Sequence, residues 1–280
     1  MASRRSQHNE QLKGKVCVVT GASSGLGESI AIMFAQRGAS VTLCGRNEDR
    51  LQASLTLCVQ ASGGQAGRFL AVSGDVVDPS ARKAIVEKTV EKFGRLDVLV
   101  ANAGVADPQC GILTASEETF DKIMNTNVKA VFFQIQEAVP HLEASKGNII
   151  VVSSVSSKIA STPNIAYPMS KAAVDHMIRC LAVDLGPKEI RVNAVNPSYV
   201  PTRIHRVPSE TAGEAQEFLL NIEAMVAAKH PLGNRCISKD AVTEAVSFLA
   251  SDAARFITGQ CLLVDGGRHL MGFLHRPVPK

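Results

Sequence analysis

The chain has 280 residues, of which 45% are hydrophobic and 20% are charged, and its formal net charge is +4. This balance excludes a disordered or membrane-embedded chain and is typical of a globular protein with a sizeable core. The basic residues are scattered and Trp is absent, so the composition disfavours a nucleic-acid-binding protein and favours a small anionic ligand.

Short runs rich in β-branched residues alternate with longer segments of helical periodicity. The predicted strands are residues 15–20, 40–44, 68–76, 96–102, 147–154, 190–196 and 260–265. Most of these runs are continuously apolar, as parallel strands covered on both faces should be. We therefore predict an α/β fold, a single-domain doubly wound (Rossmann) parallel sheet of about seven strands with helices on both faces.

The helix between the third and fourth strands shows how its ends are encoded. Asp78 stands at the N-cap, Pro79 occupies the first helical position, and Gly94 ends the segment. No linker interrupts the alternation, so we predict one domain over residues 13–270. A flexible N-terminal extension (1–12) and a C-terminal tail (271–280) complete the chain.

A glycine-rich turn, TGASSGLG, follows the first predicted strand. Gly21 permits a tight turn, Gly25 lets backbone amides approach a ligand, and Gly27 lets the next helix pack closely on the sheet. Free N–H groups and the helix dipole favour a pyrophosphate at this point. The alternative is an ordinary glycine-rich turn that binds nothing.

Tyr167 and Lys171 are four residues apart at the start of a predicted helix, so their side chains share one face. We expect the Lys171 ammonium to favour the phenolate and to lower the pKa of Tyr167, which makes this tyrosine a usable general acid or base. Ser154, thirteen residues upstream at a strand end, offers a hydroxyl to stabilise an oxyanion, although capping that strand end is its alternative role.

These motifs together resemble the short-chain dehydrogenase/reductase family over residues 14–267. The resemblance rests on the order of TGASSGLG, ANAG (101–104), NTNV (125–128), VVSS (151–154), YPMSK (167–171), VNAVNPSYVPT (192–202) and FITGQCLLVDGG (256–267). It implies that Tyr167 protonates the substrate oxygen, Ser154 orients it and Lys171 holds the nicotinamide ribose. Asn127 resembles the fourth catalytic residue, which holds a water next to the lysine, and Asn125 is the competing candidate.

The resemblance also implies the cofactor contacts. The expected cofactor-binding residues are Gly21, Ser23, Ser24, Gly25, Leu26, Gly27, Arg46, Asp75, Val76, Asn102, Ala103, Gly104, Tyr167, Lys171, Pro197 and Thr202. Gly45 stands where NAD-dependent members usually carry an acid, and Arg46 follows it, so NADP(H) is preferred and NAD(H) remains the second choice. Each of these two assignments has an alternative. Arg46 is then a plain surface residue close to Asp49, and Asp75 is a turn residue at the end of a strand.

Two segments depart from the family pattern or vary within it. Ser198 replaces the usual glycine after Pro197, which predicts strain if the position needs a positive φ. Residues 201–229 are expected to select the substrate, because Ala215, Phe218, Leu219, Ile222, Met225 and Val226 form an apolar helical stripe. This stripe predicts either a lid over an apolar substrate or packing in the core or between subunits.

Seven widely spaced cysteines without a CxxC pair indicate free thiols in a reducing compartment. The sequence contains no HExxH motif and no paired Cys/His spacing, so we expect no metal site. The N-terminus lacks the apolar stretch of a signal peptide, so we expect a cytoplasmic protein without membrane insertion. Mitochondrial targeting by Arg4 and Arg5 is the alternative, against which Glu10 argues. The resemblance implies a homo-oligomer, a tetramer or dimer.

The predicted function is an NADPH-dependent reductase that acts on a carbonyl substrate, a ketone, a 3-oxoacyl compound or a xenobiotic, with Tyr167 as general acid. The first alternative is an NAD-dependent alcohol or hydroxysteroid dehydrogenase that works oxidatively. The second is a nucleotide-binding sensor or scaffold without catalysis, and the joint presence of Asn127, Ser154, Tyr167 and Lys171 argues against it.

Overall fold

A computed structural model describes residues 10–107, 110–160, 164–202, 204 and 212–271, with the side chains of 212–216 and 218 excepted. Residues 1–9 of the predicted extension and 272–280 of the predicted tail therefore lie outside the described residues. Leu12 corrects the boundary of the extension, because it is fully buried and its amide donates to the carbonyl oxygen of Arg37 at 2.9 Å. The packed domain thus begins before residue 13.

The described strands form one seven-stranded sheet in the order β3-β2-β1-β4-β5-β6-β7, and every pairing is parallel. The strands are β1 (Val16–Thr20), β2 (Ser40–Gly45), β3 (Phe69–Ser73), β4 (Val98–Ala101), β5 (Asn148–Val152), β6 (Arg191–Pro197) and β7 (Cys261–Val264). The direction of winding reverses between β1 and β4, where a doubly wound sheet opens a crevice at the carboxyl ends of its strands. The predicted fold is confirmed.

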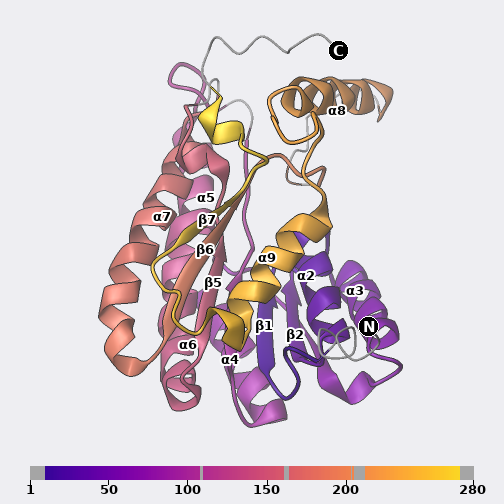
Figure 1. Cartoon of the computed structure of the whole chain (residues 1–280), viewed down its shortest axis with the longest axis vertical. Coiled ribbons are helices and arrows are strands. Elements are labelled where there is room, and N and C mark those ends of the chain that lie inside the picture. The colour runs from indigo at the N-terminus through magenta and orange to yellow at the C-terminus, as the bar shows by residue number, and fades with distance from the viewer. Residues whose placement is uncertain (1–9, 108–109, 161–163, 203, 205–211, 272–280) are drawn as a thin grey trace.

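Helices cover both faces of the sheet (Figure 1). The helices are α2 (Gly25–Gln36), α3 (Glu48–Ala61), α4 (Pro79–Phe93), α5 (Glu117–Met124), α6 (Ala130–Ser145), α7 (Ala166–Leu185), α8 (Ala212–Ala227) and α9 (Lys239–Ala250). Phe34 of α2, Leu51 of α3 and Val246 of α9 belong to one buried apolar core. Ile135 of α6 and Ile178 of α7 belong to a second buried core, which they form with other side chains of the strands. These two cores fix the sheet as a rigid base for the crevice.

Helix α4 begins and ends as its sequence predicts. The Asp78 side chain accepts a hydrogen bond from the backbone N–H of Ser80 at 2.8 Å, and Gly94 adopts the left-handed conformation with φ 76° at the C-cap. Each cap of this kind contributes about 1 kcal/mol because it satisfies a backbone group that the helix itself leaves unpaired.

A single π-helical turn, Asn125–Lys129, joins α5 to α6. Such turns insert one extra residue into a helix and occur frequently at functional sites. Here the turn carries both asparagines that competed for the fourth catalytic position, and it directs Asn127 into the protein interior, where it is buried.

Candidate active site

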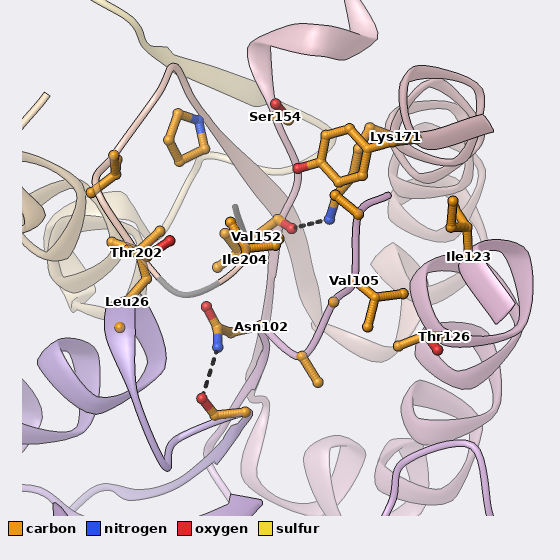
Figure 2. A pocket seen from close by; sticks show the side chains of 18 of the residues that line it. Leu26, Asn102, Val105, Ile123, Thr126, Val152, Ser154, Lys171, Thr202 and Ile204 are labelled. Atoms are coloured by element: carbon orange, nitrogen blue, oxygen red, sulfur yellow. Dashed lines mark hydrogen bonds between the residues drawn. The ribbon is translucent and has the colours of Figure 1, made fainter. Parts of the chain in front are cut away.

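A cleft of about 610 Å³ opens at the carboxyl ends of the strands. Figure 2 shows Ser154 and Lys171 on one side of it and Leu26 and Thr202 on the other. Every predicted site residue lines this cleft except Gly27 and Asn127, which lie behind its wall. The fold therefore brings together residues that are up to about 180 positions apart, as the crevice of a doubly wound sheet does.

Three positions of the turn between β1 and α2 require glycine, for reasons of backbone conformation or of space. Gly21 and Gly25 have φ values of +66° and +64°, which disfavour any residue with a Cβ. A Cβ at Gly27 would collide with the backbone of Gly21 and would lie 2.5 Å from Nδ2 of Asn102. Ser24 and Gly25 at the start of α2 line the cleft, and the N-cap residue Ser24 makes no side-chain cap bond to the helix amides.

Asn102 fastens this turn to the end of β4. Its Nδ2 donates to the carbonyl oxygen of Thr20 at 2.8 Å, while the Thr20 hydroxyl accepts from the backbone N–H of Asn102 at 3.0 Å and of Ala103 at 3.1 Å. These bonds tie the two strands at the point where the winding reverses. Position 101, an alanine, contributes no side chain to these bonds.

The end of β2 forms the cationic part of the cleft. A Cβ at Gly45 would lie 2.9 Å from the side chain of Ser23, so the tight contact leaves no room for an acidic side chain unless Ser23 moves. Arg46 is exposed, and its guanidinium lies 3.5 Å from the Asp75 carboxylate. Asp75 also accepts from the backbone N–H of Val77 at 3.1 Å, so its predicted role as a turn residue is observed as well.

Arg50 was missed by the sequence reasoning, although it lies four residues after Arg46 in the first turn of α3. It lines the same cationic part of the cleft and is half-buried. Its Nε is buried and has no hydrogen-bond partner among the described residues. A buried donor without a partner is costly, so this atom is available to an anionic ligand.

Tyr167 and Ser154 meet in the opposite part of the cleft. Burial raises the pKa of the Tyr167 phenol above its usual value, and a hydrogen bond with the Ser154 side chain acts in the opposite direction. The prediction that Lys171 lowers this pKa was wrong: Nζ of Lys171 lies over the tyrosine ring, 5.6 Å from its centroid, and loss of hydration dominates. Tyr167 is therefore a protonated acid at neutral pH.

Lys171 is buried, and its Nζ donates to the carbonyl oxygen of Val152 at 2.9 Å (Figure 2). Burial lowers the pKa of this ammonium group to about 8, while the negative charge of Asp175 acts to raise it. One of its three donors is thus used by the end of β5. The side chain is held at the cleft wall close to Tyr167, as the shared helical face predicts.

Asn127 lies behind the cleft wall and braces it. Its Nδ2 donates to the carbonyl oxygen of Val105 at 2.9 Å and to the Ser170 hydroxyl at 3.0 Å, and its Oδ1 accepts from the backbone N–H of Val105 at 2.9 Å. A Cβ at Gly104 would lie 3.3 Å from this Oδ1 and 3.7 Å from Nζ of Lys171, so both side chains approach the same glycine. Asn125 is only half-buried and lines no part of the cleft.

Ser198 fits its position without strain, contrary to the expectation raised by its replacement of glycine. It is not among the residues with positive φ, and its backbone N–H donates to the carbonyl oxygen of Val264 at 3.1 Å. Its hydroxyl accepts from Nη1 of Arg268 at 3.0 Å. Arg268, also missed by sequence reasoning, lines the cleft from the segment after β7.

The predicted lid segment reaches the cleft at both of its described ends. Thr202 and Ile204 line the cleft before α8, and the buried Val226 lines it from the last turn of α8. Met225 is 55% exposed, whereas Ala215 and Phe218 lie outside the described side chains. The helix predicted for this segment is confirmed.

No group of His, Cys, Asp and Glu with metal-ligand geometry occurs among the described residues, and all seven cysteines are free thiols. In the part of the chain that the structure describes, no helix is long and apolar enough to span a bilayer.

Comparison with known proteins identifies the family. The family described as Enoyl-(Acyl carrier protein) reductase matches residues 21–269. The chain is 36% identical to versicolorin reductase stcU of Emericella nidulans, over 94% of this chain and 98% of that protein. It is 35% identical to the 3-oxoacyl-[acyl-carrier-protein] reductase FabG of Thermotoga maritima, over 92% and 98%.

A solved structure agrees with these relatives. A short-chain dehydrogenase/reductase of unknown function from Caenorhabditis elegans, determined with cofactor, superposes with a TM-score of 0.84 at 32% identity and covers 94% of this chain and 98% of that one. With the seven-stranded sheet, the glycine turn and the Ser154–Tyr167–Lys171 cleft, these matches show that the chain belongs to the short-chain dehydrogenase/reductase family and is an NAD(P)-dependent oxidoreductase.

Proposed function

We propose that the chain is an NADPH-dependent reductase that transfers hydride to the carbonyl group of a ketone, 3-oxoacyl or xenobiotic substrate. The observation that carries this proposal is the convergence of Ser154, Tyr167 and Lys171 on one side of a cleft whose other side holds the glycine turn. The names of the relatives, which include versicolorin and 3-oxoacyl reductases, support the reductive direction.

The cleft fits a dinucleotide. Gly21 and Gly25 leave the backbone open at the start of α2, Arg46 and Arg50 place positive charge beside it, and Nε of Arg50 lacks a partner. Asp75 and Val76 would border the adenine, while Lys171 would hold the nicotinamide ribose and Thr202 the carboxamide. A bound nicotinamide supplies the hydride, and the protein supplies position and charge.

The side chains of the cleft can complete the reaction with one proton transfer. Tyr167 stays protonated at neutral pH because burial raises its pKa, so its phenol can donate a proton to the substrate oxygen. Ser154 can donate a hydrogen bond to that oxygen as negative charge develops on it. Asn127, which braces Val105 beside Lys171, would hold the water that returns a proton to the lysine.

Several apolar side chains line the cleft, namely Val105, Val155, Val200, Ile204 and Val226, the last of them from α8. We propose that these residues border the substrate and that α8 serves as a lid. Such a lining favours a carbonyl compound with an apolar body, which buries its surface when it binds.

A homo-oligomer is the remaining part of the proposal. Phe132 of α6 is 44% exposed, Leu262 of β7 is 37% exposed and Phe256 is 98% exposed, so apolar side chains remain on two surfaces of the single chain. Light scattering of the purified protein should give two or four times the monomer mass, and a monomer at micromolar concentration would contradict this part.

Cofactor preference is tested by titrating the protein with NADPH and with NADH while following cofactor fluorescence. If Arg46 binds the 2′-phosphate, Arg46→Ala should weaken NADPH binding about 10- to 100-fold, because a charge-assisted bond of about 1.5–3 kcal/mol is lost. NADH binding should be unchanged. Arg255→Ala, an exposed arginine outside the cleft, is the control. Equal affinity for both nucleotides in the unaltered protein would contradict NADP(H) preference.

A further inference from the structure

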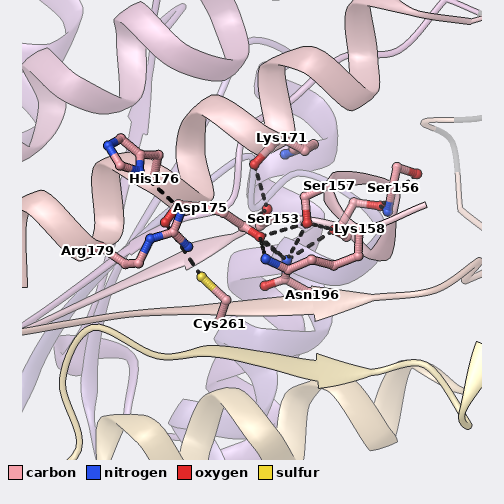
Figure 3. Close-up of polar contacts among 11 residues, drawn as sticks. Ser153, Ser156, Ser157, Lys158, Lys171, Asp175, His176, Arg179, Asn196 and Cys261 are labelled. Carbon is pink, nitrogen blue, oxygen red and sulfur yellow. Dashed lines mark hydrogen bonds and ion pairs between the residues drawn. The ribbon is translucent and has the colours of Figure 1, made fainter. Parts of the chain in front are cut away.

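A buried acidic side chain lies directly behind Ser154 and Lys171. Asp175 is on α7, one helical turn after Lys171, and its side chain is 2% exposed. Figure 3 shows it at the centre of a polar cluster formed by the segment after β5, by β6 and by α7. Nothing in the proposed reaction uses this carboxylate directly, and it does not line the cleft.

Two serines on either side of Ser154 in the sequence donate hydrogen bonds to the Asp175 carboxylate. The Ser153 hydroxyl donates to Oδ1 of Asp175 at 2.7 Å, and the Ser157 hydroxyl donates to Oδ2 at 2.7 Å. Lys158 forms an ion pair with Oδ2 at 3.2 Å. The carboxylate thus holds the segment on both sides of Ser154 against α7.

Strand β6 joins the same cluster. The side-chain amide of Asn196 lies 3.0 Å from both oxygens of Asp175 and 3.1 Å from the carbonyl oxygen of Ser154. The Ser157 hydroxyl also lies 2.9 Å from that carbonyl oxygen. The backbone of Ser154 is therefore fixed by groups that themselves bind Asp175.

The carboxylate remains charged at neutral pH. Burial raises the pKa of Asp175, but hydrogen bonds from Ser157, Ser153 and Asn196 and the contact with Lys158 outweigh burial and leave the pKa below its usual value. A fully hydrogen-bonded buried carboxylate of this kind rigidifies the groups around it.

We infer that Asp175 is a positioning residue that sets the placement of the Ser154 hydroxyl relative to Tyr167 by clamping residues 153–158 onto helix α7. The inference rests on the proposed function for its meaning, because Ser154 matters only if a carbonyl oxygen is reduced beside it. Misplacing a reacting group by about 1 Å can cost a hundredfold in rate.

Asp175 also acts on Lys171 through its charge. The groups that face this pair are Tyr167 and Arg179 on α7, Lys158 after β5, and Cys261 on β7, whose thiol donates to the Asp175 backbone oxygen at 3.8 Å. Asp107 and Lys122 are further charged residues that line the cleft. Removal of the Asp175 charge leaves burial as the dominant influence, so the pKa of Lys171 falls further below about 8.

The test compares Asp175→Asn with Asp184→Asn, which removes an exposed aspartate from the same helix. Turnover of NADPH with phenanthrenequinone is measured against pH, together with NADPH affinity, melting temperature and hydrogen–deuterium exchange of residues 153–158. Ser157→Ala removes one hydrogen bond to the Asp175 carboxylate and provides a second variant if Asp175→Asn does not fold.

We expect Asp175→Asn to lower kcat roughly 10- to 100-fold with KM and NADPH affinity nearly unchanged. The fall of kcat at alkaline pH should begin at a lower pH than in the unaltered protein. Exchange of residues 153–158 should be faster, and Ser157→Ala should show smaller effects in the same directions.

The inference is overturned if Asp175→Asn matches the Asp184→Asn control in kcat, or if its kcat falls while its pH profile stays in place. If the unaltered protein reduces no carbonyl compound, the proposed function fails on its own. In that case unchanged exchange of residues 153–158 in Asp175→Asn overturns the clamp, and faster exchange supports the clamp independently of turnover.

Discussion

Replacing Ser154 by alanine should make Tyr167 a weaker acid. The Ser154 side chain acts to lower the pKa of the phenol, against the larger opposite effect of burial, and this contribution is lost in Ser154→Ala. A hydrogen bond to a charged acceptor contributes about 1.5–3 kcal/mol. The ionisation constant of Tyr167 should therefore fall when this hydrogen bond is removed.

The composition of the chain makes this titration direct. It has two tyrosines and no tryptophan, so in a Tyr199→Phe background the ultraviolet absorbance of phenolate reports Tyr167 alone. Burial raises the pKa of Tyr199 to about 12, so its phenolate would otherwise add to the absorbance at high pH. Ser80→Ala, at an exposed site on α4, is the control. An unchanged or lower pKa of Tyr167 in Ser154→Ala would refute the hydrogen bond as its cause.

Three further predictions concern the turn, the lid and the dependence on pH. Gly27→Ala should lower the free energy of unfolding by about 1–3 kcal/mol, because the added Cβ meets the backbone of Gly21. Thermal unfolding measures this change. The control Gly67→Ala, which places a Cβ in open space, should have little effect. Shortening α8 should raise KM for the carbonyl substrate more than the dissociation constant of NADPH, and equal losses would refute the lid. The reductive kcat should fall as pH rises through about 8, because Lys171 then loses its proton; a flat kcat from pH 7 to about 10 would contradict its role.

Much of the fold followed from local patterns. Short runs rich in β-branched residues, most of them continuously apolar, predicted all seven strands. Asp78, Pro79 and Gly94 predicted both ends of α4. These signals depend on neighbouring residues alone. Leu12 was missed because its burial depends on packing into the core beside residues distant in the sequence, which the local sequence does not encode.

The cleft was predicted from motif spacing, whereas its electrostatics were not. The spacing of Tyr167 and Lys171 placed both on one face of α7. The sequence does not show how far their side chains are buried, so the direction in which the pKa of Tyr167 shifts was predicted wrongly. The roles of Arg50 and Arg268 depend on where α3 and the segment after β7 pass the cleft. Such contacts arise from tertiary packing and leave no periodic signal.

The central claim is that Tyr167 supplies the proton in an NADPH-dependent carbonyl reduction. The most direct test is the oxidation of NADPH by the purified protein with a panel of ketones, 3-oxoacyl thioesters and quinones, compared with Tyr167→Phe. We predict turnover of at least one carbonyl by the unaltered protein, and a rate about 10²- to 10⁴-fold lower in the variant with NADPH affinity intact. Equal turnover by Tyr167→Phe, or binding of NADPH without reduction of any carbonyl, would contradict the account.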